Sequence, residues 1–245
     1  MPIRLFAPAA AFAAALGLAA PALASTHGGS AAPHARTTPS TKKSATFAGY
    51  SINGTNGMTG ITTTIMVPKL KCSKTNRAIG ASTGLYEDST TNFSSANLFI
   101  GCVKGKATYF PFLTVNGHEQ DFRKTAAHPG DMVTLQTDAN TTETVVEVDD
   151  LTHSFSKSKT SAGYSSFVAN PWIGDVTWSS QGKVLGVPDF GKIHFRTATL
   201  NGTPFGSLTP QLRFDRYNKS KTTLQIHTGA YGPSMQAFGT TFKHS

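Results

Sequence analysis

In the stretch Lys192-Ile193-His194-Phe195-Arg196-Thr197, apolar or hydroxyl side chains alternate with lysine, histidine and arginine. A period of two is the pattern of a half-buried antiparallel strand, because successive side chains point to opposite faces of a sheet. Runs of the same kind are centred on Thr63, Val146, Ile226 and Thr240. Turn-forming pairs separate the runs, and no window of about a dozen residues carries a helical stripe. The sequence therefore predicts an all-β antiparallel sandwich of two packed sheets.

The N-terminus predicts export. A basic residue precedes the apolar stretch 5–18, and Ala22-Leu23-Ala24 supplies the small-x-small pattern of a cleavage site, so residues 1–24 are expected to be a signal peptide. Residues 25–44 are rich in Ser, Thr and Pro and are expected to form a flexible leader. Residues 45–245 are expected to be the folded domain of a secreted protein, since no later segment has the ~20 apolar residues of a membrane span.

The two cysteines, Cys72 and Cys102, are expected to form a disulfide, as an even pair in an exported chain does. Closing a loop of about 30 residues stabilises a fold by about 3 to 4 kcal/mol in the chain-entropy model. The eight histidines are scattered, and His153, His194 and His227 are expected to lie singly on strands. A metal site assembled across strands stays an open alternative, but no metal or cofactor is expected.

The formal net charge of +9 is spread along the chain. A generally cationic, soluble surface is the favoured interpretation, and adsorption to anionic cell-surface polymers is the alternative. No nucleic-acid-binding motif accompanies the charge.

The sequence contains a serine-hydrolase motif but not the secondary structure that this motif requires. Gly80-Ala81-Ser82-Thr83-Gly84 fits G-x-S-x-G, the elbow that needs a buried parallel strand before it and a helix after it. The following residues, 85–90, do not form a helical pattern, so a serine hydrolase is disfavoured.

A more specific signal is a set of short segments in fixed order. They are Thr46-Phe47-Ala48-Gly49-Tyr50, Val67-Pro68, Cys72, Ile79-Gly80, Gly101-Cys102, Tyr109-Phe110-Pro111-Phe112, Pro129-Gly130-Asp131, Trp172-Ile173 and Pro188-Asp189-Phe190-Gly191. This order resembles the glutamic peptidases, or eqolisins, from about Thr46 to Phe242. The resemblance implies a concanavalin-like sandwich with a substrate cleft on the concave face of one sheet.

The resemblance also implies which residues carry chemistry. In that family a glutamate acts as general base on a water, and a glutamine amide holds the water and stabilises the oxyanion. The glutamine position falls on Phe99, and the two candidate glutamate positions fall on Pro171 and Asp175. Phenylalanine donates no hydrogen bond, and loss of such a donor costs on the order of 10²–10³ in rate. The catalytic pair is therefore expected to be lost, with Asp175 as the one surrogate base if activity remains.

The resemblance places Phe47, Phe99, Phe112, Thr114 and Trp172 in or near the cleft. Aromatic surface in a concave sheet suits extended ligands, although buried phenylalanines often only fill core space. The expected function is non-catalytic or re-tasked binding of an extracellular peptide, protein or glycan.

Two enzymatic alternatives stay open. One is an acid-acting endopeptidase with a shifted active site around Asp175. The other is a different secreted hydrolase, such as a polysaccharide hydrolase that uses Glu147 and Asp149, although carboxylates at i and i+2 on one strand more often form a solvated edge.

Overall fold

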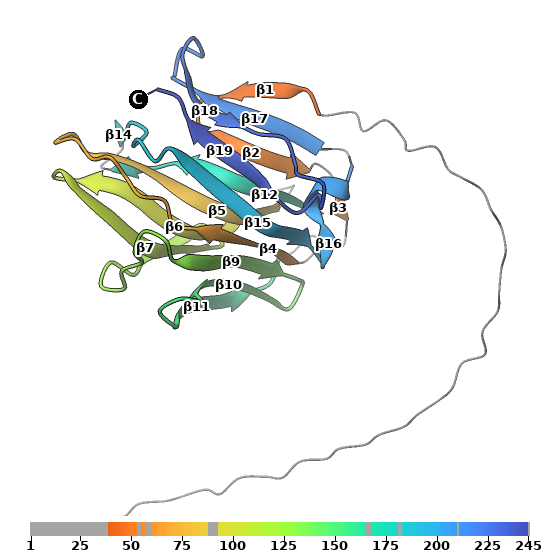
Figure 1. Cartoon of the computed structure of the whole chain (residues 1–245). Coiled ribbons are helices and arrows are strands. Elements are labelled where there is room, and N and C mark those ends of the chain that lie inside the picture. Colours follow the sequence, from red (N-terminus) through yellow and green to blue (C-terminus); the bar gives the residue numbers. More distant parts are fainter. Residues whose placement is uncertain are drawn as a thin grey trace, which may run out of the picture. The chain divides into compact units, whose positions relative to one another are not determined.

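The computed structural model describes residues 39–52, 55–56, 60–87, 93–164, 168–180, 183–209 and 211–244. The expected signal peptide and residues 25–38 of the expected leader lie outside these residues. The regular secondary structure of the described residues is almost entirely β-strand (Figure 1). Their one helical element is the 3₁₀ turn η1 (Phe205–Ser207), and no described helix has the length and apolar character needed to cross a bilayer.

The strands form two sheets that pack face to face. Sheet A has antiparallel neighbours except at one edge, where β1 and β17 are parallel. In spatial order its strands are β8 (His118–Asp121), β7 (Lys106–Val115), β6 (Phe93–Val103), β5 (Arg77–Glu87), β12 (Val168–Thr177), β2 (Phe47–Ile52), β17 (Gln211–Tyr217) and β1 (Thr41–Ser44).

Sheet B is antiparallel throughout its described ladders. Its strands, in spatial order, are β11 (Phe155–Ala162), β10 (Glu143–Asp150), β9 (Met132–Ala139), β4 (Gly60–Met66), β15 (Lys192–Leu200), β19 (Phe238–Phe242) and β18 (Leu224–Thr228). At one side β18 also pairs with β17, which joins the two sheets. Shorter strands are β3 (Thr55–Asn56) beside β12, β16 (Thr203–Pro204) beside β15, and the pair β13 (Ser179–Ser180) and β14 (Lys183–Val184).

The core lies between the sheets and explains the alternation in the sequence. In β4 and β9 every second residue is fully buried, as in Ile61, Thr63 and Ile65. Leu98 and Leu113 of sheet A belong to the same core cluster. Strand β6 has no visible alternation because both of its faces are covered. The predicted all-β sandwich is confirmed.

One strand lies inside the stretch that the composition assigns to the leader. Thr41–Ser44 forms β1 and pairs with residues 213–216 of β17. The Arg213 guanidinium donates to the Thr41 hydroxyl and holds the strand in register. The two-residue alternation does not detect β1, because three of its four side chains are exposed.

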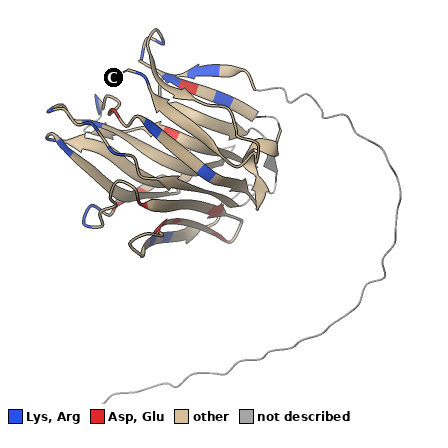
Figure 2. Ribbon diagram, in the orientation of Figure 1, with Lys and Arg blue, Asp and Glu red and all other residues tan. Residues whose placement is uncertain are grey.

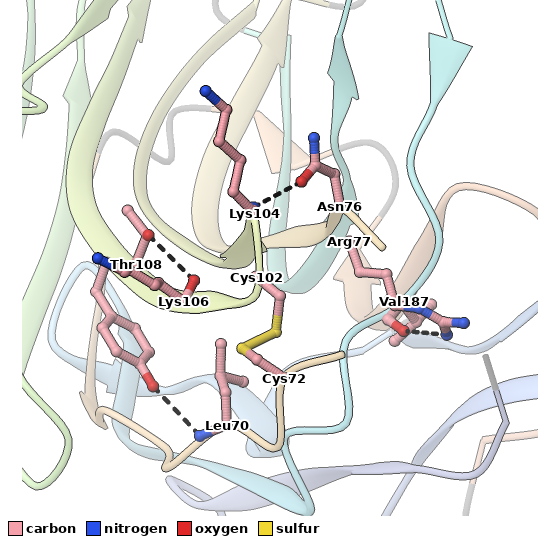
Figure 3. The surroundings of a disulfide bond; sticks show 10 residues. Leu70, Cys72, Asn76, Arg77, Cys102, Lys104, Lys106, Thr108 and Val187 are labelled. Atoms are coloured by element: carbon pink, nitrogen blue, oxygen red, sulfur yellow. Dashed lines mark hydrogen bonds between the residues drawn. A yellow bond between two sulfur atoms is a disulfide. The ribbon is translucent and has the colours of Figure 1, made fainter. Parts of the chain in front are cut away.

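The predicted disulfide between Cys72 and Cys102 is confirmed. It ties the segment after β4 to the end of β6 (Figure 3). Hydrogen bonds support the same region: the Leu70 N–H donates to the Tyr109 hydroxyl at 3.3 Å, and the Lys104 N–H donates to Asn76 Oδ1 at 2.8 Å. The cross-link therefore anchors a long irregular segment to the sandwich.

Asp175, the expected surrogate base, faces the core of the sandwich. Its exposure is 0 %, and no hydrogen bond within the described residues reaches either carboxylate oxygen. Burial raises the pKa of Asp175 to about 7, although the Thr240 hydroxyl and the Arg216 guanidinium nearby act in the opposite direction. Burial also lowers the pKa of Arg216 to about 10. The carboxyl group of Asp175 is therefore closed off from solvent.

Removal of the disulfide is expected to destabilise the domain. The double variant Cys72→Ser/Cys102→Ser loses the constraint on a loop of about 30 residues, so its free energy of unfolding is expected to fall by about 3 to 4 kcal/mol. Urea denaturation followed by circular dichroism measures this loss. Reduction of the unmodified protein should give the same shift, and an unchanged urea midpoint in both experiments contradicts the prediction.

Asp175 is expected to make the domain less stable as the pH rises from 4 to 7. Its folded-state pKa of about 7 lies above the ordinary value of 3.8, so in this window the native state binds a proton that the unfolded state has released. The free energy of unfolding therefore falls with rising pH, by on the order of 3 kcal/mol in total, and levels off above pH 7.

The measurement is urea denaturation at a series of pH values, with Asp175→Asn compared with the unmodified chain. The asparagine variant should lack this part of the slope, because it carries no titrating group at the position. Asp121→Asn, which changes an exposed carboxylate, is the control and should keep the slope. Parallel profiles for Asp175→Asn and the unmodified chain between pH 4 and 7 contradict the assignment.

Candidate ligand-binding cleft

A cleft of about 540 Å³ lies on the face of sheet A that points away from sheet B. Its lining comes from all eight strands of sheet A and from the segment around Trp178. In β6 the lining residues are Phe93, Ser95 and Asn97, while Ala96 and Leu98 point into the core. The two-residue period of the strands thus separates a cleft face from a core face.

Glycines make this face hollow. Gly84 of β5 is paired with Trp172 of β12, and a β-carbon at Gly84 would lie 2.3 Å from the indole ring. Gly49 and Gly174 face each other across β2 and β12, and a β-carbon on either would lie 2.1 or 2.2 Å from a backbone oxygen of the other strand. The Trp172 ring therefore lies low over the sheet, and the floor beside it stays free of side chains.

A first aromatic group, which we call the Trp172 group, consists of Phe47, Trp172, Phe214, Tyr86 and Phe93. Phe47 contacts Trp172 edge to face at 5.9 Å and Phe214 at 5.6 Å between ring centroids. Tyr86 lies 6.3 Å from Trp172 and 5.5 Å from Phe93. All five residues line the cleft, and burial raises the pKa of the Tyr86 phenol, so it stays a neutral donor at physiological pH.

A second aromatic group, the Trp178 group, consists of Phe99, Phe110, Phe112 and Trp178. Phe99 stacks on Phe110 at 4.4 Å, and Trp178 covers Phe99 edge to face at 4.8 Å. Phe112 and Trp178 line the cleft, with their rings 4.6 Å apart, whereas Phe99 lies beneath Trp178 and is 4 % exposed. Phe99 therefore shares the cleft face of β6 but packs against other rings instead of lining the cavity.

The amide of Asn97 is used entirely by the protein itself. Its Nδ2 donates to Ser95 Oγ at 2.9 Å, to the Ser95 carbonyl at 3.1 Å and to the Phe112 carbonyl at 3.0 Å. Its Oδ1 accepts from the Ser82 hydroxyl. Both N–H groups and the carbonyl oxygen are thus occupied, and rotation of the amide toward a ligand would leave several buried groups unpaired.

The only carboxylate among the described lining residues is that of Glu119 on the exposed edge strand β8. Glu119 is opposite Thr114, which in turn is opposite Ser95. The backbone of β8, which carries Glu119, is therefore two strand spacings, about 10 Å, from the backbone of β6. It is four strand spacings, about 19 Å along the sheet, from Asn170 on β12. No motif in the sequence marks Asn97, Glu119 or Asn170 as cleft residues, because only strand register brings them to one face.

The structure brings together most of the residues expected in the cleft. Phe47, Phe112, Thr114 and Trp172 line the cavity, Phe99 lies beside it, and Asp175 points to the opposite face of β12. Pro171, the other glutamate position, is buried as well, and its neighbour Asn170 lines the cleft instead.

The G-x-S-x-G segment has a structural role. It lies inside β5 between two antiparallel neighbours, and Ser82 is fully buried. This arrangement confirms that the segment is no nucleophile elbow, since the elbow sits between a parallel strand and a helix.

The cleft combines apolar rings, hydroxyl groups and one rim carboxylate. Such a surface can bury apolar side chains and hydrogen-bond a backbone. It lacks, among the described lining residues, a free amide next to a carboxylate that could hold a water between them.

Comparisons with known proteins place the fold. Scytalido-glutamic peptidase with a transition-state analogue inhibitor superposes with a TM-score of 0.64 and 15 % identity, over 81 % of this chain and 98 % of that one. SCP-B, an eqolisin in complex with the tripeptide Ala-Ile-His, gives a TM-score of 0.62 and 15 % identity over the same shares. Aspergilloglutamic peptidase from Aspergillus niger gives 0.54 and 18 %, over 68 % of this chain and 99 % of that one.

A search of curated proteins gives no significant match. A sequence model of the peptidase A4 family, in contrast, matches residues 45–226, which is most of the domain. The chain therefore belongs to the peptidase A4 family, the glutamic peptidases or eqolisins.

Proposed function

We propose that this protein is an exported, non-hydrolytic member of its family that holds an extended peptide in the cleft. The observation that carries the proposal is the state of Asn97: the cleft is open at about 540 Å³, yet this amide is hydrogen-bonded to Ser82, Ser95 and Phe112. The cavity lies in the 300–1,000 Å³ range of small-ligand sites.

The lining favours a peptide with apolar side chains. The Trp172 group and the Trp178 group provide ring surfaces for such side chains, and Ser95 and Thr114 lie between β5 and β8 on the same face. Glu119 at the rim attracts a basic side chain or a free amino group. Two related structures hold peptide ligands, the tripeptide Ala-Ile-His and a peptide-based transition-state analogue, which supports a peptide over a glycan.

Export is part of the proposal. It rests on the expected signal peptide at residues 1–24, and it is supported by the disulfide, because such bonds persist in oxidising compartments.

Peptide binding is expected to change the tryptophan fluorescence. The chain has two tryptophans, and both line the cleft, so the emission reports on the cleft alone. Titration of Ala-Ile-His, and of longer peptides that contain it, should give a saturable change. Trp178→Ala should weaken binding by about 10-fold or more, since it removes an aromatic ring from the contact, while Trp172 still reports.

Leu151→Ala is the matched control, because Leu151 is an exposed apolar residue outside the lining. It should leave the affinity unchanged. A saturable response to a chito-oligosaccharide, without any response to peptides, would show that the ligand is a glycan and not a peptide. The absence of any response to either ligand contradicts a binding cleft.

Proteolysis is expected to be absent. The chain is incubated with a reduced and alkylated substrate protein between pH 2 and 7, and the fragments are counted by mass spectrometry. The unmodified chain should yield no more fragments than Glu119→Gln does. The reason is that no amide among the described lining residues is free to stabilise an oxyanion near this carboxylate. Robust acid cleavage that Glu119→Gln or Asp175→Asn abolishes would instead establish an endopeptidase with a shifted active site.

A further inference from the structure

A cluster of ionisable side chains, none of which lines the cleft, lies at one end of β9 and β10. Figure 1 labels these two neighbouring strands. The cluster consists of His128 and Asp131, which precede β9, and of Asp150 and His153 at the turn between β10 and β11. The expectation that His153 lies singly on a strand is wrong: it lies in a turn, and its ring centroid is 5.1 Å from that of His128. The chain separates the two histidines by more than twenty residues, and sheet pairing of Val133 with Asp150 brings them together.

The donor atoms lie at distances typical of ligands around one metal ion. One ligand atom each from His128, Asp131 and His153 lies within 4.8 Å of the other two. His153 Nδ1 is 3.1 Å from Asp131 Oδ1, and His128 Nδ1 is 3.6 Å from Asp131 Oδ2. In a tetrahedral zinc site with bonds of about 2.0–2.1 Å, neighbouring donor atoms are about 3.3 Å apart.

Asp150 supplies an independent sign of a missing ligand. Its Oδ1 accepts from the backbone N–H groups of Thr152 and His153 at 2.8 and 3.0 Å. Its Oδ2 is buried, accepts no hydrogen bond from any described residue, and lies 3.8 Å from His153 Nδ1. Burying an unpaired carboxylate oxygen costs free energy of folding, and a positive group bound at the cluster would offset this cost.

The backbone around the cluster is fixed, so the geometry is preorganised. The Met132 N–H donates to the Thr152 hydroxyl at 2.9 Å, and the Leu151 N–H donates to the Met132 carbonyl at 2.8 Å. The His128 N–H donates to Asp131 Oδ2 at 2.7 Å. These bonds join the two ligand-bearing turns before any ion arrives.

The local charge favours a cation. Eight of the thirteen acidic residues of the chain fall between residues 119 and 150, although the net charge of the whole chain is +9. In the ribbon of Figure 2, residues of the acidic types, coloured red, lie in the region of β9 and β10. Within the described part of the chain, the ion-pair partners of Asp131 and Asp150 are the two histidines, and no lysine or arginine is among them.

We propose that His128, Asp131 and His153 bind a zinc ion, with Asp150 as the fourth ligand. Two imidazole nitrogens with carboxylate oxygens are a typical zinc set, whereas calcium and magnesium prefer oxygen ligands alone. The side chains of the two histidines are 62 % and 54 % exposed, so the ion can enter from solvent. The bound ion would hold the segment before β9 against the β10–β11 turn.

The test is isothermal titration calorimetry of the full chain, free of any affinity tag, with zinc chloride. We expect one zinc ion per chain, and about a 10-fold or greater loss of affinity in both His128→Ala and His153→Ala. His227→Ala is the matched control, because His227 also pairs with a buried carboxylate, Asp215 at 3.1 Å, but belongs to no metal-ligand group among the described residues. It should bind zinc as the unmodified chain does.

A second readout is the melting temperature. Zinc should raise it in the unmodified chain and in His227→Ala, but not in His128→Ala, whose exposed side chain can be removed with little effect on the metal-free fold. The absence of saturable binding, or equal affinities for His128→Ala, His153→Ala and the unmodified chain, overturns the proposal. Magnesium chloride as titrant should give no binding, and equal affinities for magnesium and zinc also overturn it.

Discussion

The glycines on the cleft face of β2, β12 and β5 are the constraint on which the cleft depends. Where Gly49, Gly84 and Gly174 lie, a side chain would collide with backbone of the next strand or with the Trp172 ring. Because these positions carry no β-carbon, neighbouring rings lie down over the sheet instead of standing up from it. The result is a hollow in a surface that ordinary strand pairing would leave filled.

The two faces of sheet A carry different kinds of side chain. The core face encloses Asp175 and Arg216, while the outer face carries the stack of Phe99 on Phe110 beneath Trp178. A ring stack contributes about 0.5–1.5 kcal/mol beyond its area burial, so the outer face adds to stability at the position where the family resemblance places a glutamine. In the proposed function, this part of the cleft serves packing and ligand contact, not bond cleavage.

Much of the sandwich was predictable, because strands with one solvated face, such as β4 and β15, alternate visibly in the sequence. The disulfide followed from the two cysteines alone. The cleft was predictable only in its aromatic half, through the ordered segments around Phe47, Phe112 and Trp172. Asn97 and Glu119 were not, since their positions depend on the register of β6, β7 and β8. His128 and His153 could not be predicted as neighbours for the same reason, because the register of β9 and β10 brings their two turns together.

The parallel strand β1 has a consequence for solubility. It is the edge strand of sheet A, and an edge strand offers unpaired backbone groups to any other extended chain. Lys42 and Lys43, both exposed, occupy the centre of this strand. A second molecule that added its own β1 there would bring like charges together at the distance of neighbouring strands, so the pair of lysines protects the protein against growth into fibrous aggregates.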